Sequence, residues 1–424
     1  MNKLTELIRD DMRPALGVTE PGAICFAVSK AKSYTKGAVT GVKLELNSGM
    51  YKNAFTCGIP NSNEVGNTFS AALGIVAGKP DKGLLSLEGV TEQDNVEAQK
   101  LIDAGLIDVQ LSGISSDIFI RATVKTATDC CELTIKHAHT NVCKIVVNDN
   151  VILEQEEAPV TAATVPEVPE IHKYTLEQLY HYITTVPLEE ISFIRDAYTV
   201  NMDLFETGLA STRTTFAKQL WKLNDNMVIS KDAHKTAQLL CNAAIEARVI
   251  GLDKPAMSIT GSGAHGIICT LPLYALYKTE NLREEVLLRA TALSYLVTMY
   301  IKEYSGKLSA FCGCAIAAGT GMACALLYMR GGSLKQMSYA INNMASSITG
   351  MICDGGNQGC TMKGIVAVDA AYRSVEMALA DTYIFNEHGI NGKTPEDTMH
   401  HMGLIASPGM VATEKTIVDI MQSK

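Results

Sequence analysis

The sequence predicts an α+β N-terminal domain with antiparallel strands, followed by a mostly all-α C-terminal domain. Alternating apolar runs between Ile107 and Val147 predict strands separated by short turns. From His172 onward the apolar residues recur with helical periodicity. The stretch from Glu154 to Pro169 is acidic and Pro-rich, which is typical of a linker. We therefore expect domains over 1–153 and 172–424, joined by a linker over 154–171.

Composition limits the class of protein. The chain has 424 residues, of which 47% are hydrophobic and 19% charged, as in globular proteins large enough for two domains. A net charge of −9 and the lack of a basic run argue against nucleic acid as a partner. The 12 cysteines follow no small-domain disulfide pattern, and the charged, polar start predicts no signal peptide. We expect a protein of the reducing cytoplasm.

The first part of the chain mixes helices and strands. Leu4, Leu7 and Ile8 form the apolar stripe of one helix. A second helix is expected to begin at Thr19 as N-cap, with Pro21 in its first turn. Further helices are expected over 64–77 and 92–104, a loop over 47–53, and strands over 38–46, 107–111, 118–124, 131–135 and 144–147.

The second part reads as helices, with no repeat of fixed period. One expected helix, Leu308–Met329, carries no charge and is long enough to span a membrane. Its residues are mostly small, and it lacks an aromatic belt. We interpret it as a helix buried in a protein domain. The other helices are expected over 176–185, 188–207, 211–221, 233–249, 282–304, 334–349, 363–380 and 395–401.

Three cysteines of the second part form a candidate metal site. Cys353 and Cys360 flank a turn rich in glycine, and Cys312 lies about forty residues upstream. Thiolates bind iron, and glycines let backbone N–H groups approach the sulfides, so the pattern suits an iron–sulfur cluster with one iron left open to substrate. Cysteine is also a common core residue, and zinc would require a fourth Cys or His. Cys314 competes with Cys312 as the first ligand.

Two further segments carry candidate substrate contacts. The Gly-rich loop 260–266 can offer backbone N–H groups and Ser262 to a carboxylate, although a simple turn explains it equally well. His265 in this loop is either a substrate contact or a structural histidine. Glu20 and Cys25 follow the start of the second helix, where the helix dipole favours a thiolate, so Cys25 is a candidate base or nucleophile and Glu20 a candidate substrate contact. Burial in the core is the alternative for Cys25.

These segments together resemble the L-cysteine desulfidase family, which is related to the α chain of iron–sulfur L-serine dehydratases. The resemblance rests on residues 17–25, the turn 57–60, the loop 261–266 and the run 353–360, and extends from about residue 5 to the end. It implies a [4Fe–4S] cluster on Cys312, Cys353 and Cys360, with Cys25 as the proton acceptor. It also implies β-elimination of L-cysteine to pyruvate, ammonia and sulfide without pyridoxal phosphate, with Ser262 near the substrate.

Several alternatives stay open at this point. The same mechanism serves an L-serine dehydratase, which removes hydroxide in place of sulfide. A pyridoxal-phosphate lyase requires a Schiff-base lysine, for which Lys363 is the best candidate, and a phosphate site that the sequence does not provide. A non-catalytic iron–sulfur sensor or electron carrier would normally use four protein ligands. A small amino acid is the expected partner, and a homodimer is expected from the frequency of two-fold oligomers.

Overall fold

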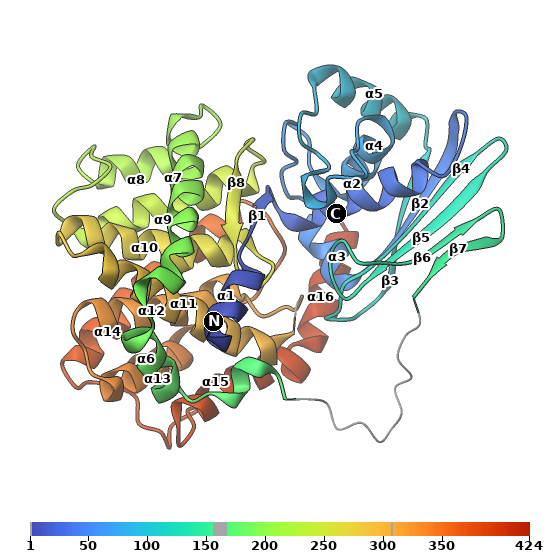
Figure 1. The fold of residues 1–424 in the computed structure, drawn as a ribbon. Coiled ribbons are helices and arrows are strands. Elements are labelled where there is room, and N and C mark those ends of the chain that lie inside the picture. Colours follow the sequence, from blue (N-terminus) through green and yellow to red (C-terminus); the bar gives the residue numbers. More distant parts are fainter. Residues whose placement is uncertain (1, 156–167, 307) are drawn as a thin grey trace.

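The computed structural model describes residues 2–155, 168–306 and 308–424. One part is a sheet with helices on one side, and the other is a large group of helices (Figure 1). The mixed α+β class is thereby confirmed, with the main sheet in the N-terminal half. Of the expected linker, residues 156–167 lie outside the described residues.

The main sheet has six strands in the order β3-β2-β4-β5-β6-β7. Neighbouring strands are antiparallel except β2 and β3, which are parallel. A parallel pair requires a long crossover, and helices α3, α4 and α5 provide it. The strands are β2 (Val39–Asn47), β3 (Ile107–Gly113), β4 (Phe119–Thr126), β5 (Cys130–Lys136), β6 (Val142–Val147) and β7 (Asn150–Glu154).

Helices cover one face of this sheet. Alternate residues of β4, such as Ile120, Ala122 and Val124, are buried, as the period of two in a strand requires. They face α2, which in turn packs against α4 (Figure 1). The helices of this part are α2 (Thr19–Lys32), α3 (Ser48–Ala54), α4 (Gly66–Val76) and α5 (Glu92–Asp103).

The helical part packs around α9, α10 and α12, whose residues are almost all buried. Such all-round burial explains why its central segments are apolar on every face. Its helices are α6 (Leu176–Thr185), α7 (Arg195–Ala210), α8 (Phe216–Leu223), α9 (Ala233–Val249), α10 (Gly263–Thr279), α11 (Glu284–Ser305), α12 (Gly319–Met329), α13 (Leu334–Ile348), α14 (Gly359–Leu379), α15 (Pro395–Leu404) and α16 (Val411–Gln422).

Both ends of the chain cross between the two parts. Helix α1 (Lys3–Asp11) contacts α11, and strand β1 (Arg13–Leu16) pairs with β8 (Pro255–Ser258) in a small antiparallel sheet. At the other end, α16 packs against α3 beside the main sheet (Figure 1). The two parts are therefore connected by these contacts as well as by the chain that follows β7.

Two sequence expectations differ from the structure. The expected loop 47–53 is the helix α3, anchored by Asn47, whose amide donates to the carbonyls of Ser115 and Asp117. The expected helix Leu308–Met329 begins only at Cys314, with a π-helical turn (Cys314–Ala318) before α12. Within the part of the chain that the structure describes, no helix has the length and apolar character needed to cross a membrane.

Candidate active site

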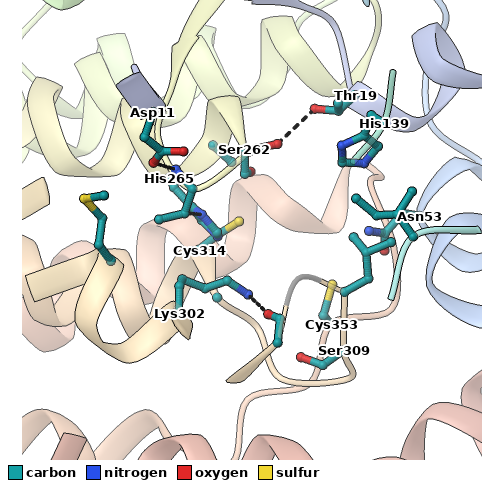
Figure 2. Close-up of a pocket in the computed structure, with 18 of the residues that line it drawn as sticks. Asp11, Thr19, Asn53, His139, Ser262, His265, Lys302, Ser309, Cys314 and Cys353 are labelled. Atoms are coloured by element: carbon teal, nitrogen blue, oxygen red, sulfur yellow. Dashed lines mark hydrogen bonds between the residues drawn. The ribbon is translucent and has the colours of Figure 1, made fainter. Parts of the chain in front are cut away.

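A cavity of about 680 Å³ brings together most of the candidate residues. Its wall combines the start of α2, the loop before α10, the end of α11 and the two cysteine segments (Figure 2). Glu20, Ser262, His265, Cys353 and Cys360 all line it. Residues separated by hundreds of positions in the sequence thus meet at one site between the two parts of the molecule.

Cys312 and Cys353 are held together by a short antiparallel backbone pairing. Phe311 bridges Ile352, the N–H of Cys312 donates to the carbonyl of Met351 at 3.1 Å, and that of Cys353 donates to Ala310 at 2.6 Å. Residues that alternate along such a pair share a face, so the two thiols are diagonal neighbours on one side of the ladder. This explains how cysteines about forty residues apart reach the same wall.

The turn between Cys353 and Cys360 is fixed against α3. Gly355 has a φ of 102°, and a Cβ at this position would lie 2.4 Å from the carbonyl oxygen of Lys52. Gly356 donates its N–H to the carbonyl of Asn53 at 3.1 Å. Only glycine combines this backbone angle with so close an approach. The turn places Cys360 in the first turn of α14.

Cys312 and Cys314 are hydrogen-bonded neighbours. The helix begins at Cys314, so Cys312 lies outside it and the two side chains do not diverge as they would within a helix. The pKa of Cys312 is raised well above its usual range, first by hydrogen bonding with Cys314 and then by burial. Cys314 lines the cavity, whereas Cys312 is buried and does not line it. The choice between them as first ligand stays open in this geometry.

The cysteine wall offers thiol donors to a metal group. Among residues 2–155, 168–306 and 308–424, no three His, Cys, Asp or Glu side chains are grouped closely enough to hold one metal ion. A cluster takes its thiolates on different irons, so its ligands surround it and do not converge on one point. Burial, and then the charge of Cys353, raises the pKa of Cys360 to about 12, while Lys363 acts in the opposite direction. A bound metal would deprotonate such thiols. The donor set therefore fits a cluster in its chemistry.

The loop before α10 is held in an unusual backbone conformation. Thr260 has a φ of 51° and Gly261 one of 73°. The carboxylate of Asp11 accepts a hydrogen bond from the N–H of Thr260, and the Thr260 hydroxyl is hydrogen-bonded to Nδ1 of His265 (Figure 2). Burial, and next the positive charge of Lys302, lower the pKa of His265 to about 3, so its imidazole is neutral. The loop presents the N-terminus of α10 to the cavity.

Glu20, in the first turn of α2, supplies a negative charge to the cavity. The carboxylate accepts a hydrogen bond from Nδ2 of Asn53 at 2.9 Å, and Nε2 of His139 lies 3.7 Å away. Burial alone would raise the pKa of this carboxyl, but His139, Asn53 and Arg248 together lower it to about 2. Glu20 is therefore ionised although it is buried.

Lys302 brings an amine to the cysteine wall. It lies near the end of α11 and donates to the carbonyl of Gly306 at 2.7 Å (Figure 2). Its side chain is buried, and burial lowers the pKa of its ammonium group from the usual value of 10.5. Cys314 and Cys353 act in the opposite direction. Among the cavity residues it is an amine that could release and accept a proton.

Cys25 is not brought to the cavity. It is fully buried on the side of α2 that packs against α4, in an apolar cluster with Ile59, Phe69 and Leu73. Burial raises the pKa of its thiol to about 12, which opposes the effect expected from the helix dipole. Its role as proton acceptor stays a prediction, and this position does not support it.

Sequence reasoning missed several residues of the cavity. Asn53 fell in an expected loop, Lys302 in an expected helix without assigned function, and Asp11 and Arg248 were not singled out. Arg248 belongs to a long helix whose burial on all sides is not visible in its own sequence. The signal for Arg248 in the sequence was a charged residue within a largely apolar helix.

The cavity defines a small-molecule enzyme site, with grouped thiols, ionised side chains of both signs and a helix N-terminus. The family model described as serine dehydratase alpha chain matches residues 81–419. A UPF0597 protein of Clostridium botulinum strain Okra is 39% identical, over 99% of this chain and 98% of its own length. Relatives with the same name in Caldanaerobacter subterraneus and Alkaliphilus oremlandii are 33% and 30% identical, each over at least 98% of both chains.

The chain therefore belongs to the serine dehydratase alpha chain family. This membership supports an enzyme of the lyase class and an iron–sulfur context for its cysteines. The name UPF0597, which these relatives share, states no reaction.

Proposed function

We propose that this protein is an iron–sulfur-dependent lyase that removes the β-substituent of a small amino acid, with L-cysteine as substrate. The observation that supports the proposal is that Cys314, Cys353 and Cys360 line one cavity together with ionised and proton-accepting side chains, while Cys312 is hydrogen-bonded to Cys314. L-Serine is the alternative substrate, since the family model is that of a serine dehydratase.

Cys353, Cys360 and either Cys312 or Cys314 would hold a [4Fe–4S] cluster. When bound, the cluster supplies a Lewis-acidic iron for the leaving group or the carboxylate. Lys52 and Lys363 lie close enough for their charge to act on these thiols, which favours an anionic group at this wall.

The elimination requires a base at the α-carbon. We assign this role to Lys302, because its amine lines the cavity beside the cysteine wall, whereas Cys25 lies outside the cavity. The amine takes the α-proton, and the electrons of that C–H bond form the Cα–Cβ double bond while the C–S pair leaves with sulfur. The released aminoacrylate becomes an imine, and water converts the imine to pyruvate and ammonia.

Anaerobic purification followed by iron and sulfide analysis tests the cofactor. Sulfide and pyruvate assays with L-cysteine and L-serine then test the reaction. We expect iron in the protein and sulfide release from L-cysteine. Pyruvate from L-serine alone would keep the mechanism and change the substrate. Protein that binds no iron after anaerobic reconstitution would overturn the proposal.

A further inference from the structure

Arg248 is a buried cation that forms no ion pair with the described residues. It lies near the end of α9, is 5% exposed and lines the cavity. Its Nε has no hydrogen-bond partner among the described residues, and no described carboxylate forms an ion pair with its guanidinium group. A buried, unpaired charge is unfavourable unless a ligand completes it.

The surroundings of Arg248 are suited to a carboxylate. A Cβ on Gly263 would lie 2.6 Å from Nε of Arg248, so the guanidinium packs directly on the first residue of α10. The first N–H groups of a helix have no partner within the helix, and the side chain of Ser262 forms no capping bond with them. The arginine, the free N–H groups and the Ser262 hydroxyl together form a site for a planar anion.

Glu20 contributes a negative charge to the same cavity. Thr19, the neighbour of Glu20, donates its hydroxyl to the carbonyl of Gly261 at 3.3 Å and so places the start of α2 against the anion loop (Figure 2). The charge of Arg248 contributes to the low pKa of Glu20, although the two side chains form no ion pair. The cavity is thus lined by two opposite charges that form no ion pair with each other.

We propose that Arg248 and Glu20 bind the two charges of a free α-amino acid, Arg248 the carboxylate and Glu20 the α-ammonium group. This inference rests on the proposed function for the identity of the site, and it adds the residues that recognise the two charged groups of the substrate. An ester or an N-acylated amino acid lacks one of the two charges, and a peptide carries them on different residues. The site therefore selects amino acids in their free form.

L-Alanine is a suitable probe, because it carries both charges but has no leaving group at its β-carbon. Its binding to the anaerobic protein can be measured by calorimetry without turnover. We expect the wild-type protein to bind L-alanine and to bind N-acetyl-L-alanine and L-alanine methyl ester at least about tenfold more weakly, since a charged hydrogen-bonding partner is lost.

Three variants separate the role of Arg248 from general damage. Arg248→Met should weaken L-alanine binding about 10- to 100-fold and raise KM more than it lowers kcat. Gly263→Ala keeps every charge but displaces the guanidinium, and should also weaken binding. Arg330→Met, at the far end of α12 over Tyr372, is the matched control and should bind as wild type.

The outcomes distinguish this inference from the proposed function. Unchanged L-alanine binding in Arg248→Met, or no L-alanine binding by the wild-type protein, would overturn the inference. Pyruvate formation would then still support the lyase. Conversely, L-alanine binding that depends on Arg248 in a protein without elimination activity would support the inference and overturn the proposed reaction.

Discussion

The amine of Lys52 lies 2.6 Å from the carboxylate of Glu414, although 362 residues separate them in the chain. Lys52 belongs to α3 beside the sheet, and Glu414 to the C-terminal helix α16. Lys52 also donates to the carbonyl of Ser309 at 2.9 Å, just before the cysteine wall. One buried ion pair therefore connects the C-terminus, the sheet part and the candidate active site.

Removing the cation of this pair should destabilise the fold. Lys52→Met leaves Glu414 buried without its partner, and breaking a buried pair from one side costs about 3–5 kcal/mol. Denaturant unfolding measures the loss. Lys415→Met, which removes an exposed pair with Asp419 on the same helix, is the control and should change stability little. Equal effects of the two substitutions would contradict the prediction.

Substitutions of Lys302 and Cys25 decide which residue is the proton acceptor. Lys302→Met should abolish turnover and leave the iron content intact. Cys25→Ser should keep measurable turnover, because Cys25 is outside the cavity. Steady-state assays under anaerobic conditions, with iron analysis of each variant, check both results. Loss of turnover in Cys25→Ser alone would return the role to Cys25.

The cysteine wall can be tested one thiol at a time. Cys353→Ser and Cys360→Ser should lose the visible absorption of the cluster and most of the iron. Of the substitutions Cys312→Ser and Cys314→Ser, only the one that removes the iron-binding thiol should cause the same loss. This result identifies the first ligand. Cys324→Ser is the control, because Cys324 is buried within α12 and does not line the cavity. Unchanged spectra in Cys353→Ser would contradict the ligand assignment.

The turn between Cys353 and Cys360 should tolerate no side chain at Gly355. Gly355→Ala introduces a Cβ at a φ of 102° and 2.4 Å from the carbonyl oxygen of Lys52, so the turn must shift. We expect weaker iron retention, measured as the rate of iron loss to a chelator. Gly350→Ala is the matched control, since a Cβ there meets no atom within 4 Å. Equal retention in the two variants would argue against a rigid turn.

Glu20 should make the protein sensitive to acid. Its pKa is about 2 in the folded state against 4.5 ordinarily, so the unfolded chain binds the proton first as pH falls. The stabilisation is complete above about pH 5 and is lost toward pH 2, by about 3.5 kcal/mol at 1.4 kcal/mol per pKa unit. Unfolding curves of wild type and Glu20→Gln at several pH values should converge toward low pH. Parallel curves would contradict the prediction.

Local patterns predicted much of the fold. The helices at Leu176–Thr185 and Ala233–Val249 have the bounds that their sequence indicated, because their caps and periodicity are local properties. The strands from Ile107 to Val147 were also expected, although the parallel pairing of β3 with β2 was not. Helix α10 was missed, since its Gly-rich start and internal Pro272 read as helix-breaking signals.

The candidate site was predictable only in its pieces. Cysteine spacing and the Gly-rich loop are visible in the sequence, and the structure places them on one cavity. Spacing does not show that α3 fixes the turn at Gly355, or that Arg248 faces the loop. These contacts depend on tertiary packing between distant elements, and so does the exclusion of Cys25 from the cavity.

The pairing of β1 with β8 has a consequence for synthesis of the chain. The hydroxyl of Ser258 donates to the carbonyl of Arg13 at a sequence separation of 245, so the first strand emerges from the ribosome long before its partner. At 5–20 residues per second, the delay is on the order of tens of seconds. During that time the N-terminal strand has an unpaired edge, a state that chaperones commonly protect. Translation rate and chaperone supply should therefore influence the yield of this protein more than its thermodynamic stability alone would indicate.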